Sequence, residues 1–124
     1  ITMPIARRHE LLSWANLDSN RYIIEDDYDS EFRFTGRPVP SMQSISPDDK
    51  VIYINTFSKT LSPALRAGYM LLPRALQVRR KNIEYMSCSV PVLDQYILCE
   101  LLDGGSFERH LNRIRRQIRK ENRR

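Results

Sequence analysis

The chain has 124 residues, of which 41% are hydrophobic and 28% charged, a composition typical of a globular protein. No stretch approaches the roughly 20 apolar residues of a membrane-spanning helix, and the first residues lack the apolar run of a secretory signal. The net charge of +5 comes from residues 107–124, which carry eight Lys or Arg and two Glu. Basicity is therefore confined to one terminal segment and does not indicate a chain-wide nucleic-acid surface.

The first half of the chain predicts one helix and one short strand before a loop. Pro4 and an apolar stripe through Leu11 and Leu12 predict a helix over 4–17. The β-prone residues 22–24 predict a strand, which ends in an acidic run. Residues 33–49 are rich in Pro, Ser and Asp and predict a loop with little regular structure.

The second half predicts two more strands and then three helices. The expected strands cover 51–54 and 67–72, and the expected helices cover 74–87, 92–103 and the residues after Ser106, which is a plausible N-cap. Because the strands are continuous apolar runs, we expect an α/β fold with a sheet covered on both faces. A three-stranded sheet has two open edges, so we also expect a piece of a larger domain.

The cysteines and histidines do not predict a metal or redox site. Cys88 and Cys99 have no motif spacing and are expected to be buried free thiols in a reducing cytoplasm. His9 and His110 are both expected on helix surfaces, which argues against a histidine-based metal centre. We therefore predict no metal site of this kind.

The acidic run over 25–31 offers a second possible metal site. Asp27, Asp29 and Glu31 alternate as in a calcium-binding loop. However, Phe32 stands where that loop needs glycine, and no bidentate Glu follows at its twelfth position. A solvated or helix-capping acidic loop is the simpler interpretation.

Two predicted strands end in chemically functional residues. The first end supplies Asp26, Asp27 and Tyr28, and the second supplies Thr56, Ser58 and Lys59, with Arg66 following. Parallel α/β sheets bind ligands at the carboxyl ends of their strands. Pyridoxal 5′-phosphate (PLP) uses all of these groups: an amine for its aldehyde, a carboxylate for its pyridine nitrogen, a phenol for its ring oxygen, and hydroxyls with a guanidinium for its phosphate.

Two motifs carry a family resemblance. The run Glu-Asp-Asp-Tyr-Asp-Ser-Glu-Phe at 25–32 and the pattern S-K-T-L-x-P-x-L-R-x-G-Y at 58–69 closely resemble the aminotransferase-like domain of MocR/GabR-type regulators of the GntR superfamily. The resemblance covers essentially the whole chain. It implies part of the large domain of a fold-type I PLP-dependent transferase, a three-layer α/β/α fold with its sheet incomplete here.

The resemblance also implies residue roles. Lys59 is similar to the Schiff-base lysine, Asp26 to the partner of the pyridine nitrogen and Tyr28 to the partner of the ring oxygen. The implied phosphate ligands are Thr56, Ser58 and Arg66. Asp27 remains the alternative acid, although strand alternation places Asp26 and Tyr28 on one side and Asp27 on the other, which favours Asp26.

The family further implies a domain division and partners. Residues 1–105 are expected to be part of the large domain, and residues 106–124 the start of the helix that leads to the small domain. The implied function is an effector-sensing domain that binds an amino acid or amine through PLP in a cytoplasmic, homodimeric regulator. DNA would be bound only by a winged-helix domain absent from this chain, and no membrane is expected. A true class I/II aminotransferase and an inactive structural fragment remain the alternatives.

Overall fold

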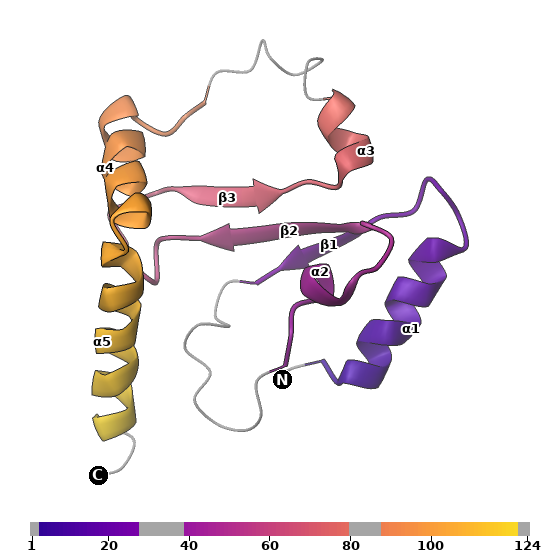
Figure 1. The fold of residues 1–124 in the computed structure, drawn as a ribbon, viewed down its shortest axis with the longest axis horizontal. Helices are drawn as coiled ribbons and strands as arrows, with labels where there is room; N and C mark the ends of the chain where they lie inside the picture. Colours follow the sequence, from indigo (N-terminus) through magenta and orange to yellow (C-terminus); the bar gives the residue numbers. More distant parts are fainter. Residues whose placement is uncertain (1–2, 28–38, 80–87, 122–124) are drawn as a thin grey trace. The chain divides into compact units, whose positions relative to one another are not determined.

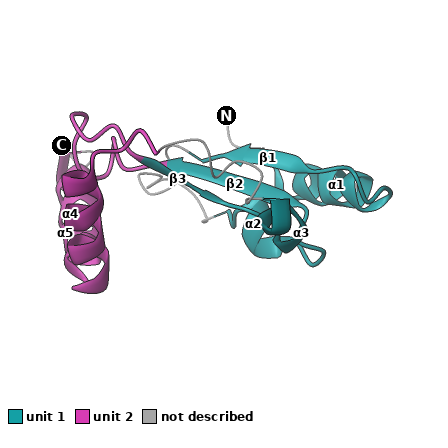
Figure 2. Cartoon of the chain, turned by 90° about the horizontal axis from the view of Figure 1, so that it is seen from above, with its two compact units in different colours: residues 1–28, 37–55, 68–86 teal, residues 29–36, 56–67, 87–124 magenta. Residues whose placement is uncertain are grey.

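A computed structural model describes residues 3–27, 39–79 and 88–121. Its elements, in chain order, are α1 (Ile5–Asn16), β1 (Ile23–Asp26), α2 (Met42–Ile45), β2 (Val51–Thr56), β3 (Gly68–Leu71), α3 (Arg74–Gln77), α4 (Val92–Asp103) and α5 (Ser106–Glu121) (Figure 1). The chain divides into two compact units (Figure 2). Unit 1 comprises residues 1–28, 37–55 and 68–86, and unit 2 comprises residues 29–36, 56–67 and 87–124.

The sheet has three strands in the order β1-β2-β3. β1 pairs with β2 in parallel, from Ile23 opposite Val51 to Asp26 opposite Ile54. β3 runs in the opposite direction to β2 (Figure 1), so the sheet is mixed. The parallel pair confirms the expected α/β architecture and brings the carboxyl ends of β1 and β2 to the same edge.

The core of unit 1 joins two helices to one face of the sheet. Leu12 of α1, Met42 of α2 and Val51 of β2 form a buried cluster. Ile23 packs against this cluster, whereas the next residue, Ile24, is 66% exposed. Since successive strand residues point to opposite faces, the face that carries Ile24 is open here, and coverage on both faces is not seen within the described residues.

Helix α2 adds one short helical turn to the segment 33–49, where the sequence predicts a loop with little regular structure. Its N-cap is Ser41, whose Oγ accepts a hydrogen bond from the Ser44 amide at 3.1 Å. The Glu25 carboxylate accepts two more, from the amides of Met42 (2.9 Å) and Gln43 (3.0 Å). A carboxylate from a distant strand therefore satisfies the N–H groups at the start of this helical turn.

Helix α3 forms the first part of the helix that the sequence predicts over 74–87. It spans Arg74–Gln77, and its Arg74 amide donates to Asp49 Oδ2 at 2.6 Å. The expected helix over 74–87 continues beyond this turn into 80–87, which lies outside the described residues.

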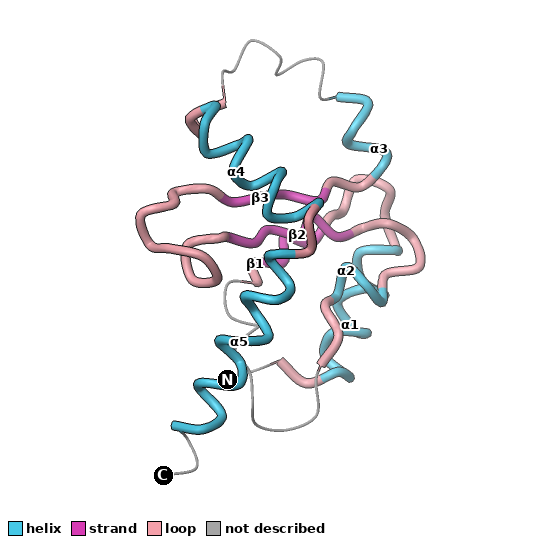
Figure 3. The backbone as a smooth tube through the Cα atoms, turned by 60° about the vertical axis from the view of Figure 1, so that its left-hand side comes forward, coloured by secondary structure: helices cyan, strands magenta, loops and turns pink. Residues whose placement is uncertain are grey.

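Unit 2 contains α4 and α5, joined by a tight turn (Figure 3). Gly105 has φ of 64°, a left-handed conformation that glycine adopts without strain. Phe107 packs edge-to-face on Phe57 with a centroid distance of 5.8 Å, and Leu111 is 7% exposed. The apolar stripe of α5 is thus partly covered, while α4 leaves large apolar side chains such as Leu93 (70%) and Tyr96 (69%) exposed.

Three side chains of the C-terminal half differ from expectation. Ser106 is the first residue of α5, and its Oγ accepts from the Arg109 guanidinium at 2.7 Å instead of capping the backbone. Cys88 and Cys99 are free thiols, but both are exposed and not buried as the sequence predicts.

None of the described helices is both long and apolar enough to cross a bilayer.

Candidate cofactor site

The segment 56–67, which comprises the last residue of β2 and the turn that leads to β3, carries four of the predicted cofactor residues: Thr56, Ser58, Lys59 and Arg66. Two backbone hydrogen bonds shape it, from the Phe57 amide to the Ala67 carbonyl (3.0 Å) and from the Leu61 amide to the Phe57 carbonyl (2.9 Å). The side chains of Lys59 and Arg66 are exposed. Because hydrogen bonds hold the backbone of this turn and both cationic side chains are exposed, the turn can present an amine and a guanidinium to a ligand.

The two predicted phosphate-binding hydroxyls lie together in this turn. Thr56 Oγ1 is 3.1 Å from Ser58 Oγ and accepts a hydrogen bond from the Ser58 amide at 3.2 Å. Ser58 Oγ donates to the Leu65 carbonyl at 3.0 Å. These bonds fix both hydroxyls to the local backbone, so their positions depend on the turn itself and not on distant elements.

Asp26 and Asp27 have different surroundings at the end of β1. Asp26 is exposed and lies opposite Ile54. Asp27 Oδ2 accepts a hydrogen bond from the Tyr53 hydroxyl at 2.9 Å, and that hydroxyl oxygen accepts one from Asn55 Nδ2 at 2.9 Å. Asp27 is therefore engaged by β2, while alternation directs Asp26 to the other face. This geometry supports Asp26 as the acid offered to a ligand.

Burial raises the pKa of Tyr53 above its ordinary value, and the hydrogen bond to the Asp27 carboxylate raises it further, although the Asn55 amide opposes this shift. The phenol therefore stays protonated at neutral pH and remains a donor to Asp27. Tyr53 also faces Tyr69 of β3, with ring centroids 6.3 Å apart. This trio of Tyr53, Asp27 and Asn55 helps to tie β1 to β2 beside Asp26.

Sequence reasoning missed a buried ion pair next to Asp26. Arg8 Nη1 donates to Glu25 Oε1 at 3.0 Å, and the two residues are 8% and 7% exposed. Arg8 also donates to the Pro40 carbonyl at 3.0 Å. A signal was present in the sequence: Glu25 follows Ile23 by two positions and so shares its core-facing side, where a carboxylate needs a partner.

The predicted site residues therefore fall into three groups. Thr56, Ser58, Lys59 and Arg66 belong to one turn of unit 2. Asp26 belongs to unit 1, at the end of β1. Tyr28 lies outside the described residues, so its assignment stays a prediction.

Comparison with known proteins shows that the chain is similar to parts of HTH-type transcriptional regulators and of aminotransferases. No family model matches it. It is 43% identical over 120 residues to the uncharacterized HTH-type transcriptional regulator YhdI of Bacillus subtilis, covering 96% of this chain and 25% of the relative. It is 45% identical over 96 residues to the probable rhizopine catabolism regulatory protein MocR of Rhizobium meliloti, covering 77% of this chain and 20% of that relative.

Among solved structures, the chain matches the kynurenine aminotransferase of Pyrococcus horikoshii in complex with PMP. The TM-score is 0.79 at 30% identity, over 94% of this chain and 29% of that one. The chain spans about a quarter of the length of the curated relatives it matches. Residues 1–124 are homologous to part of the aminotransferase-like domain of MocR-type HTH regulators and share the fold of the corresponding part of fold-type I aminotransferases.

Proposed function

We propose that this segment holds PLP through Lys59 and serves as the effector-sensing part of a transcriptional regulator. The observation that carries the proposal is the turn over 56–67, where two hydroxyls 3.1 Å apart accompany an exposed amine and an exposed guanidinium. This donor set fits the cofactor, because a dianionic phosphate takes hydroxyl and guanidinium donors and an aldehyde takes an amine.

Each residue has a separate role in this proposal. Lys59 Nζ is the point of covalent attachment, and Thr56, Ser58 and Arg66 bind the phosphate. Asp26 holds the proton on the pyridine nitrogen, and Tyr28 donates to the ring oxygen. When bound, PLP supplies an electron sink for the amino compound that it captures. Asp27, engaged by Tyr53, has no direct role.

The similarity to regulators favours sensing over turnover. The regulators YhdI and MocR are more similar in sequence, at 43% and 45% identity, than the kynurenine aminotransferase at 30%. The proposed ligand is an amino acid or amine, the proposed assembly is a homodimer in the cytoplasm, and DNA is contacted by a winged-helix domain elsewhere in the polypeptide.

Aminotransferase activity is the second candidate function, and the fold match with a TM-score of 0.79 to an aminotransferase favours it. In that case Lys59 Nζ also moves a proton on the captured amino compound. Steady conversion of an amino donor and a keto acceptor by the full-length polypeptide distinguishes the two functions. A regulator would bind the donor without sustained turnover.

The test is an absorbance titration of the full-length polypeptide with PLP. We expect wild type to develop the near-ultraviolet to visible band of lysine-bound PLP, and Lys59→Ala to lose it while keeping its circular dichroism. Lys120→Ala, which removes an exposed lysine of α5, is the matched control and should behave as wild type. An unchanged band in folded Lys59→Ala contradicts the proposal.

A further inference from the structure

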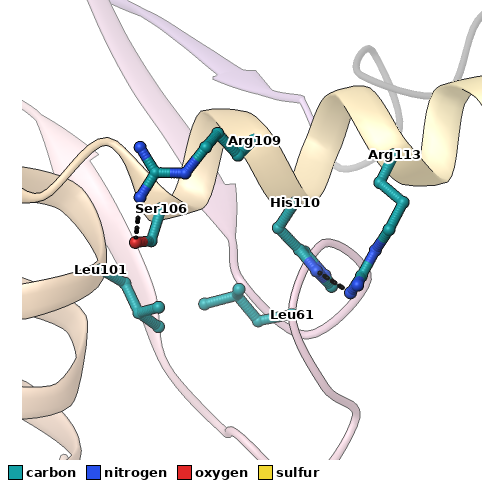
Figure 4. Close-up of a pocket in the computed structure, with 6 residues that line it drawn as sticks. All are labelled: Leu61, Leu101, Ser106, Arg109, His110 and Arg113. Atoms are coloured by element: carbon teal, nitrogen blue, oxygen red, sulfur yellow. Dashed lines mark hydrogen bonds between the residues drawn. The ribbon is translucent and has the colours of Figure 1, made fainter.

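The turn over 56–67 lies against α4 and α5 within unit 2. Leu61 of the turn lines a pocket of about 410 Å³ whose other residues come from these two helices (Figure 4). They are Leu101, Ser106, Arg109, His110 and Arg113. The sequence predicts a helix surface for His110, but here it is half-buried at the pocket wall. The turn that carries Lys59 therefore has neighbours that are distant in the chain.

A ring contact joins the turn to α5 more closely. The centroids of the Phe57 and Phe107 rings are 5.8 Å apart and the ring planes meet at 79°, an edge-to-face geometry that aromatic pairs prefer. Phe57 is 7% exposed, and Phe107 is half-buried. Because Phe107 is the second residue of α5, its backbone belongs to the first turn of that helix. The contact thus ties a loop residue to a regular element.

Phe57 is also the residue on which the turn closes. Its amide donates to the Ala67 carbonyl at 3.0 Å, and its carbonyl accepts from the Leu61 amide at 2.9 Å and from the Thr60 hydroxyl at 3.3 Å. Ala67 and Thr60 are each 3% exposed. The last two bonds bracket Lys59, so the position of Phe57 determines the backbone from which Lys59 projects.

We propose that Phe107 is a positioning residue for the cofactor site: it holds Phe57, and Phe57 holds the backbone that presents Lys59. The proposal rests on the PLP function given above, and it adds α5 as the element that controls this site. Phe57 also lies between Thr56 and Ser58, the two hydroxyl residues assigned to the phosphate. Without the ring of Phe107, PLP binding has to order the turn itself, and this entropic cost weakens the affinity.

The first measurement needs no cofactor: amide hydrogen exchange of the full-length polypeptide, read from the peptide that contains the Leu61 amide. Phe107→Leu keeps an apolar side chain but removes the ring. We expect it to speed exchange at Leu61 by about two- to tenfold, the factor that corresponds to one ring pair. Phe107→Tyr keeps the ring and should exchange as wild type does. Ile118→Ala, on the same apolar stripe farther along α5, is the control and should leave exchange at Leu61 unchanged.

The second measurement is the absorbance titration of the same variants with PLP. Phe107→Leu should weaken PLP affinity by about two- to tenfold, and Phe107→Tyr should restore it. Phe107→Met, with a side chain that fills irregular gaps, takes the place of Phe107→Leu if that variant does not fold.

The two measurements separate this proposal from the PLP assignment. If Lys59→Ala keeps the band of lysine-bound PLP, the PLP function fails, whereas exchange at Leu61 still shows whether Phe107 holds the turn. The positioning role is overturned if wild type binds PLP at Lys59 and the folded ring-deleted variant matches wild type in either measurement. Unchanged affinity makes the ring contact purely structural, and unchanged exchange means that Phe107 does not hold the turn.

Discussion

The end of β1 and the turn after β2 both carry predicted cofactor residues, but they are built differently. At the end of β1, Glu25 and Asp27 are each engaged by a partner, Arg8 for Glu25 and Tyr53 for Asp27. In the turn over 56–67 the backbone is closed by its own hydrogen bonds, and the cationic side chains are exposed. In the first region the charged side chains of Glu25 and Asp27 bond to neighbouring elements of the fold. In the second region the charged side chains of Lys59 and Arg66 are exposed to solvent.

This difference separates effects on stability from effects on ligand binding. Substitutions of the bonded residues around Asp26, such as Arg8 and Tyr53, should lower the free energy of unfolding. A substitution of Asp26 itself should lower the affinity for the cofactor. Substitutions of the exposed cationic side chains in the turn, Lys59 and Arg66, should act on the cofactor and leave folding nearly intact. The following predictions test this separation, beginning with the largest expected effect.

Breaking the buried ion pair should have the largest effect on stability. Arg8→Ala leaves the Glu25 carboxylate buried without its cation, and a loss of this kind costs about 3–5 kcal/mol. Arg7→Ala, its neighbour in α1, removes only the exposed pair with Glu10 and should cost under about 1 kcal/mol. Urea unfolding monitored by circular dichroism measures both, and equal losses would show that the Arg8 pair is not a structural anchor.

Replacing each of the two neighbouring acids by Asn should distinguish the acid that binds the cofactor from the acid that bonds only to the fold. Asp26→Asn removes a charge-assisted bond to the pyridine nitrogen worth about 1.5–3 kcal/mol, so PLP affinity should fall about tenfold or more. Asp27→Asn keeps an oxygen that can accept from the Tyr53 hydroxyl and should change PLP affinity little. Fluorescence titration with PLP gives both constants, and the reverse ranking means that the acid has been misassigned.

Removing a hydroxyl from the turn should weaken PLP binding more modestly. Ser58→Ala deletes one proposed phosphate donor, for which we expect a loss of about 0.5–1.5 kcal/mol, or roughly two- to tenfold in affinity. Ser62→Ala, in the same turn but outside the proposed donor set, is the control. Unchanged affinity in Ser58→Ala would remove Ser58 from the phosphate site.

The smallest effect should be a pH dependence at Tyr53. The folded-state pKa of Tyr53 is raised above its ordinary value, chiefly by burial and then by Asp27. The native state then binds the phenolic proton more tightly than the unfolded state, so this stabilisation is complete below about pH 10 and is lost as pH rises beyond it. The difference in unfolding free energy between wild type and Tyr53→Phe should shrink above pH 10, and a constant difference up to pH 11 would contradict the assignment.

The sequence predicted what is encoded locally. The helices α1, α4 and α5 and the three strands follow from apolar spacing, and the turn over 56–67 gathers its four residues because they are close in the chain. Alternation along β1 also predicted the different sides of Asp26 and Asp27, since period two is a property of any strand.

Features that depend on long-range partners were not predicted. The start of α2 is fixed by Glu25, 17 residues away, and Glu25 needs Arg8 of another helix. The pocket at His110 depends on Leu61, which reaches α5 only through the fold. Spacing along the chain carries no information on such contacts, so the sequence predicts a loop where α2 forms and a helix surface for His110.

The central claim is that the turn over 56–67 holds the cofactor at Lys59, and covalent labelling tests it most directly. The full-length polypeptide is loaded with PLP, reduced with borohydride, digested and mapped by mass spectrometry. We predict that the pyridoxyl label lies on Lys59. A label on Lys50, which donates to the carbonyls of Asp18 and Ser19 in unit 1, or no label at all in a folded sample, would contradict the account.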